Sequence, residues 1–254
     1  MRHAKGTIAL SQEQDLPMLR QVLNSQFITQ TQLWRFMRHA CIELSRASFC
    51  WRVRRLWAHG FLARHSLPMV DSEFVYSIAG PGVTFLETAG ALYNGPRNGP
   101  KVTVDGAGVA HALGLNSIHL DVLRSGQLVL WQTEVEIRSE NELAISSYAK
   151  HYDAILTLQV DGRPARVALE WERTAKMQSE YLRIRGLFEG EKRIDQFLYL
   201  AANSHIHSLL KKCFWGTTRN VYIGFANDLS RHELGAIEVV CAQTMKLRRL
   251  RDTL

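Results

Sequence analysis

The sequence has few cysteines and no long apolar run. Its four cysteines are far apart, form no CxxC pair and have no histidine at a zinc-binding spacing. They are Cys41, Cys50, Cys213 and Cys241. No apolar run reaches 18 residues, and the segment MRHAKGTIALSQEQD lacks the apolar core of a secretory signal. These absences predict a reduced, cytoplasmic protein with no membrane partner.

The composition is that of a folded globular protein. Of the 254 residues, 46% are hydrophobic and 22% are charged. This length exceeds one average domain and falls short of three, so we expect two domains. Lys and Arg number 31 against 24 Asp and Glu, and the resulting net charge of +7 favours a polyanionic partner.

Acidic residues are missing from one stretch of the chain. Between Leu44 and Val70 there are five arginines and neither Asp nor Glu. Farther on, Ala91–Gly108 concentrates Gly, Pro and Asn, which interrupt helices and strands. We interpret this second stretch as a linker between an N-terminal domain of residues 1–90 and a C-terminal domain of residues 109–254.

The N-terminal domain is predicted to contain three helices followed by a β-hairpin. Helical spacing of apolar residues covers Gln12–Asn24, Gln30–Met37 and the basic segment that ends at Gly60. Two short runs, Phe61–His65 and Glu73–Ile78, are predicted to pair as the hairpin. This layout is that of a winged helix-turn-helix, whose third helix enters the DNA major groove.

The third helix and the hairpin supply the predicted DNA contacts. Arginine binds phosphates and guanine edges, whereas an acidic residue facing DNA is repelled. The predicted DNA-binding residues are Arg46, Trp51, Arg52, Arg54, Arg55 and Arg64, with Arg52 on the flank of the exposed helix face. Two alternatives stay open, because the arginines could merely solvate a helix face or dock an acidic protein.

The C-terminal domain is predicted to be an α/β sandwich. The expected order is a helix at Gly108–Leu123, a strand at Leu128–Glu136, a short helix near Asn141–Ala149, paired strands at Tyr152–Val160 and Ala165–Arg173, a long helix at Gln178–Ala202, a strand at Val221–Ala226 and a closing helix at Ser230–Arg251. The dipeptide Asp161-Gly162 between the paired strands is a strong hairpin turn.

Three carboxylates are expected to meet on the paired strands. Glu170 and Glu172 are two residues apart and therefore face the same side, and strand pairing brings Asp153 close to them. Carboxylates held together repel unless a cation compensates, and a divalent ion with oxygen ligands can activate water against a phosphodiester. We predict catalytic roles for all three, with Asp153 and Glu170 as ligands of Mg²⁺ or Mn²⁺. The alternative is that the two glutamates form surface salt bridges of little consequence.

This strand pair resembles the PD-(D/E)xK nuclease superfamily. The resemblance implies an endonuclease-like fold and metal-dependent phosphodiesterase chemistry. The sequence departs from the pattern twice: Tyr152 replaces the proline before Asp153, and Glu172 occupies the lysine position. Some restriction enzymes of the superfamily have glutamate there, while other members with altered motifs only bind DNA. Arg173 and Lys176 are candidates for the missing positive charge.

Between about Leu16 and Ala226 the chain resembles the bacterial plasmid replication-relaxation family. The likeness lies in RRLWAHGFLAR, HALGLN, Glu134, YDAIL and EWERT, followed by a basic helix with Lys192 and Tyr199. In this family the strand usually reads Glu-x-Asp-Arg, so Glu172 keeps a carboxylate there. The resemblance implies an α+β protein, in which a winged helix-turn-helix is joined to a PD-(D/E)xK endonuclease-like domain.

Two functions follow as hypotheses. The first is a protein that binds double-stranded DNA through its winged helix and has a metal-dependent nicking activity. The second is a non-catalytic transcriptional regulator, or an accessory factor for plasmid replication or mobilisation, with homodimerisation as an option. The glutamate at the lysine position motivates the second hypothesis.

Overall fold

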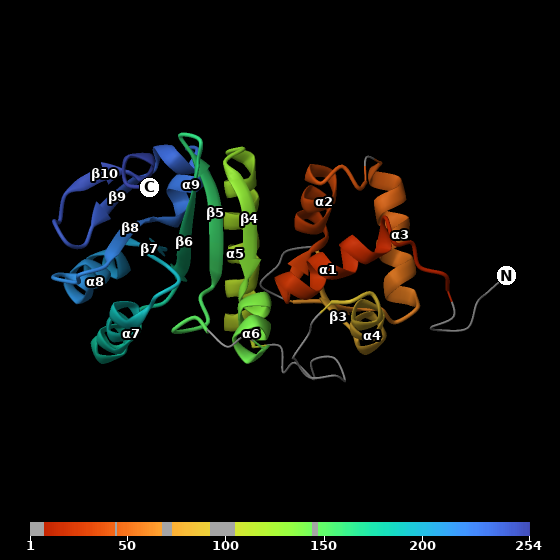
Figure 1. The fold of residues 1–254 in the computed structure, drawn as a ribbon. Coiled ribbons are helices and arrows are strands. Elements are labelled where there is room, and N and C mark those ends of the chain that lie inside the picture. The colour runs from red at the N-terminus through yellow and green to blue at the C-terminus, as the bar shows by residue number, and fades with distance from the viewer. Residues whose placement is uncertain (1–7, 44, 68–72, 92–104, 144–146) are drawn as a thin grey trace. The chain divides into compact units, whose positions relative to one another are not determined.

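The chain forms two compact units of mixed helix and strand, Met1–Leu120 and Asp121–Leu254 (Figure 1). The computed structural model describes residues 8–43, 45–67, 73–91, 105–143 and 147–254. The division between units falls inside helix α5 (Gly106–Arg124), which begins within the expected linker; residues 92–104 of that linker lie outside the described ranges. Among the described residues, no helix is both long and apolar enough to span a bilayer.

Unit 1 contains the expected three helices and the paired strands. Its elements are α1 (Asp15–Ser25), β1 (Ile28–Thr29), α2 (Gln30–His39), α3 (Arg46–Ala58), β2 (Leu62–His65), β3 (Val75–Ile78) and α4 (Gly80–Thr88). The three strands form an antiparallel sheet in the order β1-β3-β2. The sequence pattern does not reveal β1, because two residues are too few for a visible alternation.

Local signals explain where the helices of unit 1 begin and end. Thr29 caps α2: its side chain accepts a hydrogen bond from the backbone N–H of Gln32, and the Gln32 side chain accepts one from the Thr29 N–H. Gly60 follows α3 with φ of +79°, a left-handed conformation that glycine adopts without strain. The inner face of α3 buries Phe49, Val53 and Leu56 in the core.

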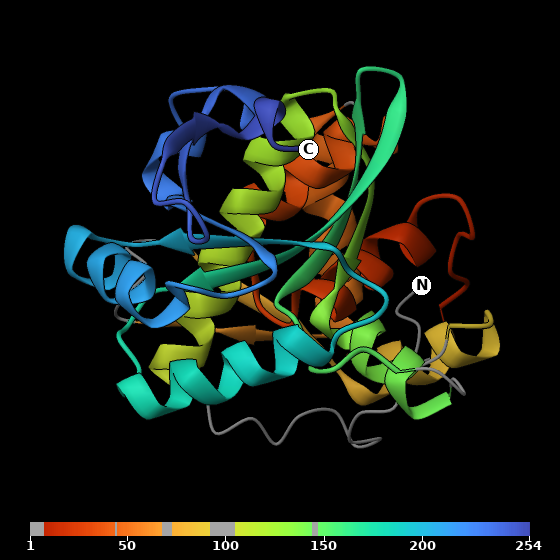
Figure 2. The same cartoon turned by 60° about the vertical axis from the view of Figure 1, so that its left-hand side comes forward.

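Unit 2 is built around a seven-stranded sheet in the order β10-β9-β8-β7-β6-β5-β4 (Figure 2). Its elements are β4 (Leu128–Thr133), α6 (Glu134–Leu143), β5 (Ala154–Val160), β6 (Arg163–Glu172), α7 (Gln178–Gly190), β7 (Gln196–Ala201), α8 (Ser204–Phe214), β8 (Asn220–Phe225), α9 (Ala226–Leu229), η1 (Leu234–Ala236), β9 (Glu238–Cys241), β10 (Leu247–Arg249) and η2 (Leu250–Asp252). Strands β6, β7 and β8 are parallel, and the other pairs are antiparallel.

Four expectations for unit 2 are wrong. The long helix ends at Gly190, and Gln196–Ala201 forms the central strand β7. The closing helix at Ser230–Arg251 is replaced by short helical turns and the strands β9 and β10. The strand from Leu128 ends at Thr133, and the following helix covers Glu134–Leu143 instead of Asn141–Ala149.

An aromatic core holds α7 and α8 against one face of the sheet (Figures 1 and 2). Phe188 of α7 stacks on Phe197 of β7 with ring centroids 4.1 Å apart, and Phe214 of α8 stacks on Phe188 at 5.6 Å. Tyr199, also on β7, packs against Phe214 and is fully buried. This packing fixes β7 beside β6, the strand with Glu170 and Glu172.

Candidate functional site

Two of the predicted DNA-binding arginines are engaged inside unit 1. The Arg52 guanidinium is buried, and donates to Asp15 at 3.2 Å and to Glu43 at 2.5 Å. Arg55 is ion-paired with the other carboxylate oxygen of Asp15. Asp15 begins α1 and is fully buried, so these pairs tie α3 to α1. The expected position of Arg52 at the edge of an exposed face is therefore wrong, and its burial argues against a DNA contact.

The remaining predicted residues lie on the surface of unit 1. Arg54 is exposed, and the Trp51 side chain is 58% exposed one turn earlier on α3. The Arg46 guanidinium lies 5.4 Å from the ring centroids of both Trp34 and Phe49. Stacking on a ring orients a guanidinium while its edge keeps N–H groups for an acceptor such as a phosphate.

Arg64 of β2 lies between two exposed aromatic rings. Its guanidinium carbon is 3.7 Å from the centroid of Trp57 and 4.2 Å from that of Phe74. Sequence periodicity assigns Trp57 to the buried stripe of α3, but this side chain is 37% exposed. Trp57 and Phe74 are thus surface residues that the pattern misses, because helical spacing does not tell the edge of a buried stripe from its centre.

In unit 2 the expected carboxylates converge where β5 begins and β6 ends. Asp153 immediately precedes β5, and its Oδ2 accepts a hydrogen bond of 2.7 Å from the backbone N–H of Trp171, between the two glutamates. Glu170 and Glu172 are each only 3% exposed. The alternative, in which the glutamates pair with Arg166, Arg173 or Lys176 at the surface, is wrong in placing them at the surface, although Glu172 does pair with Lys176.

Each buried glutamate is paired with a lysine. Lys150, in the segment before β5, is 2.5 Å from Glu170, and Lys176, between β6 and α7, forms an ion pair with Glu172. Lys176 is one of the two residues predicted from the sequence to supply the positive charge that the motif lacks. The sequence pattern does not predict the role of Lys150, because this residue lies three positions before Asp153 in a segment with no helical or strand periodicity.

The electrostatics of the cluster are set by burial. Burial raises the pKa of Glu170 to about 7; Lys150 opposes the rise and Asp153 adds to it. On the adjacent strand β7, Tyr199 is paired in register with Glu170. Its hydroxyl is buried and has no hydrogen-bond partner among the described residues. Burial, followed by the nearby Glu170 and Glu172, raises the pKa of Tyr199 well above its usual value.

These residues do not fit a divalent-cation site as they are arranged. Within the described ranges, no group of three or more His, Cys, Asp or Glu side chains is placed to hold a metal ion. Glu170, one of the two predicted ligands, is instead neutralised by Lys150, and the neighbouring Glu172 by Lys176. The expected binding of Mg²⁺ or Mn²⁺ by Asp153 and Glu170 stays a prediction, and no catalytic step is derived from it.

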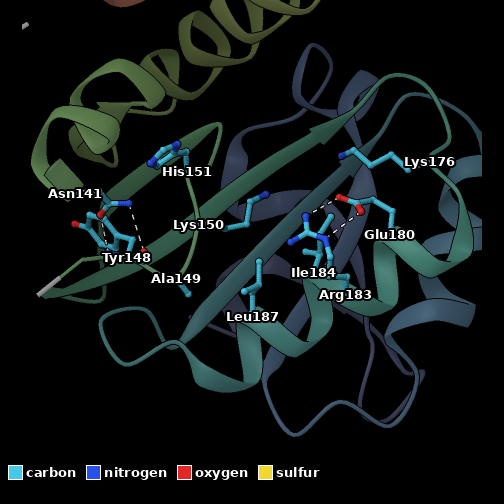
Figure 3. Close-up of a pocket in the computed structure, with 10 residues that line it drawn as sticks. All are labelled: Asn141, Tyr148, Ala149, Lys150, His151, Lys176, Glu180, Arg183, Ile184 and Leu187. Carbon is cyan, nitrogen blue, oxygen red and sulfur yellow. Dashed lines mark hydrogen bonds and ion pairs between the residues drawn. The ribbon is translucent and has the colours of Figure 1, made fainter. Parts of the chain in front are cut away.

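A cavity of about 530 Å³ lies against the two lysines (Figure 3). It is lined by the end of α6, by the segment that precedes β5, by Lys176 and by residues of α7; the lining residues are Asn141, Tyr148, Ala149, Lys150, His151, Lys176, Glu180, Arg183, Ile184 and Leu187. Sequence reasoning does not find this cavity, because its residues come from separated segments with no shared motif.

Comparisons with known proteins identify no relative. No protein-family model matches the chain, and neither a curated protein nor a solved structure matches it significantly. The resemblance to the replication-relaxation family and to PD-(D/E)xK nucleases therefore stays a prediction.

Proposed function

We propose that this protein binds duplex DNA through unit 1, as a winged helix-turn-helix. The proposal is supported by the element order α1-β1-α2-α3-β2-β3 and the sheet order β1-β3-β2. The observation that carries it is the outer face of α3, where Trp51 and Arg54 are exposed and from which acidic residues are absent. Such a face attracts phosphates and can reach base edges in the major groove.

The arginines of unit 1 take different roles in this proposal. Arg54 contacts the major groove, and Arg46 and Arg64, each stacked on aromatic rings, bind phosphates beside it. Arg52 acts indirectly, by holding α3 on α1 through Asp15. The basic face thus combines contact residues with one buried arginine that positions the helix.

Fluorescence anisotropy with a labelled duplex selected from a random pool tests the proposal. Arg54→Ala should weaken binding about 5- to 150-fold if it contacts a guanine, because such contacts contribute roughly 1–3 kcal/mol. Arg20→Ala is the matched control, since Arg20 is an exposed arginine on α1 of the same unit. Equal effects of the two substitutions, or affinity that does not change with salt, would contradict the proposal. A footprint with an inverted repeat would indicate a homodimer.

Unit 2 supports a second proposal, that of a PD-(D/E)xK-like scaffold that does not cut DNA. The order β4-α6-β5-β6-α7-β7, with β6 and β7 parallel, agrees with the resemblance seen in the sequence. The pairing of Glu170 with Lys150 and of Glu172 with Lys176 favours the non-catalytic alternative over hydrolysis. The glutamate at the lysine position of the motif points the same way.

Supercoiled plasmid incubated with the protein and Mg²⁺ or Mn²⁺ tests the second proposal. We expect the plasmid to stay supercoiled while its migration is retarded by bound protein. Nicked or linear product that is lost in Asp153→Ala would establish a nuclease and would show that the carboxylates bind a metal in the presence of DNA. Nicked or linear plasmid that still forms with Asp153→Ala would indicate a contaminating nuclease. The wild-type protein and the variant would then be purified further and compared again.

A further inference from the structure

The cavity beside Lys150 and Lys176 is lined by three cationic side chains, each of which is already paired with one carboxylate (Figure 3). We propose that it binds the terminal phosphate group of a nucleotide, either free or at the end of a single strand of nucleic acid. All its lining residues belong to unit 2, so the inference does not rest on duplex binding by unit 1.

Three cationic side chains reach the cavity from different parts of the chain. Lys150 comes from the segment before β5, Lys176 from the segment after β6, and Arg183 from the second turn of α7. Figure 3 shows Arg183 beside Glu180 on α7, with Lys150 and Lys176 drawn from separate segments. The fold therefore brings together three cations that are far apart in the sequence.

Each cation keeps hydrogen-bond donors for a ligand. An ammonium group has three N–H donors, and the glutamate partner of each lysine uses one of them. Arg183 donates Nε and one terminal nitrogen to Glu180, at 3.1 and 2.7 Å, and its other terminal nitrogen is left for a ligand. A terminal phosphate has three oxygens that accept such charge-assisted bonds.

On the cavity wall, the lysines are exposed to the cavity and their glutamate partners are buried behind them. The carboxylates of Glu170 and Glu172 are buried and do not line the cavity, whereas their lysine partners do. Glu180 is the only acidic residue among the described lining residues, and it is already paired with Arg183. An entering anion therefore meets the two ammonium groups before the carboxylates of Glu170 and Glu172, while Glu180 is held by Arg183.

The size of the cavity limits the ligand. Its volume is about 530 Å³. The volume falls within the usual range for small-molecule sites. Ile184 and Leu187 provide an apolar wall for a sugar or a base. One nucleotide fits these limits.

Anisotropy of a 3′-labelled tetrathymidylate, with and without a 5′-phosphate, tests the proposal in the full-length protein. We expect the phosphorylated strand to bind about tenfold more tightly and to be displaced by inorganic phosphate. Arg183→Gln should abolish this preference and leave the fold intact, because the Arg183 side chain is 61% exposed and, among the described residues, bonds only to Glu180 one turn away.

Arg163→Gln is the matched control. Arg163 is an exposed arginine of the same unit, seven residues before Glu170 along β6 and therefore about 20 Å away. Equal affinity for the two strands, or the same loss of preference in Arg163→Gln, would overturn the proposal. Unlabelled thymidine 5′-monophosphate and unlabelled phosphorylated strand are then compared as competitors of the labelled strand. Equal competition identifies a free nucleotide as the ligand, and weaker competition by the mononucleotide identifies a strand end. Arg54→Ala should leave the preference unchanged, so the two proposals fail separately.

Discussion

Arg52 and Arg54 are two positions apart on α3, yet their surroundings are opposite. Arg52 is buried between Asp15 and Glu43, whereas Arg54 is exposed. The sequence pattern treats both as members of one basic stretch, because it does not reveal that two acids from other segments meet Arg52. Charge count alone therefore cannot separate an arginine that stabilises the fold from one that is free to contact a ligand.

The surroundings of Arg52 predict a large effect on stability. Arg52→Met leaves the buried Glu43 carboxylate without its partner and Asp15 with Arg55 alone, and should lower the free energy of unfolding by about 3–5 kcal/mol. Arg54→Met is the matched control and should change it by no more than about 0.5 kcal/mol. Urea unfolding followed by circular dichroism measures both. Wild-type stability in Arg52→Met would mean that the buried network does not form in solution.

At the scale of elements, the sequence predicts helix starts and turns wherever all the residues of the local motif are present. The capping pair Thr29 and Gln32 starts α2, and the Asp161-Gly162 turn, with φ of +46° and +79°, joins β5 and β6 as the sequence predicts. Strand β7 is missed because QFLYLA is a continuous apolar run, which has the same appearance in a buried parallel strand as in a buried helix. Only its two neighbours, β6 and β8, decide that it is a strand.

The cap of α2 gives a test at this scale. Thr29→Ala removes the oxygen that accepts from the Gln32 N–H, and should lower the free energy of unfolding by about 1 kcal/mol. Thr31→Ala is the control, because Thr31 is exposed and lies just inside the same helix. Thermal and urea unfolding compare the two variants. A Thr31→Ala effect as large as that of Thr29→Ala would contradict the role of the cap.

At the scale of the molecule, the candidate sites follow from the fold only in part. The spacing of Glu170 and Glu172 predicts their shared face, and pairing of β5 with β6 brings Asp153 to Trp171. The lysines and the cavity depend on segments that pack from elsewhere, which no local pattern encodes. The arrangement of charge around the carboxylates, and with it the choice between cutting and binding, is thus a property of the tertiary structure.

The two units are expected to respond to pH in opposite directions. In unit 1, burial and then His39 lower the pKa of His119 from 6.5 to about 3, so the folded state favours neutral histidine. The free energy of unfolding that depends on His119 is therefore constant above pH 6.5. It decreases as the pH falls below 6.5, by at most about 1.4 kcal/mol per pH unit. In unit 2, the raised pKa of Glu170 favours the protonated carboxyl, so its contribution is lost as pH rises from 4.5 through 7.

Hydrogen exchange, corrected for intrinsic rates, resolves these opposing effects. On going from pH 7.5 to 5.5, the opening free energy of core amides around Phe36, whose ring centroid is 4.9 Å from that of His119, should fall. That of amides in β6 around Leu169 should rise, because Glu170 next to it becomes protonated. His119→Gln should remove the fall in unit 1 and leave the rise in unit 2. His232→Gln, which alters an exposed histidine, should change neither. A parallel change of both units in the wild-type protein would mean that neither buried group sets the response to pH.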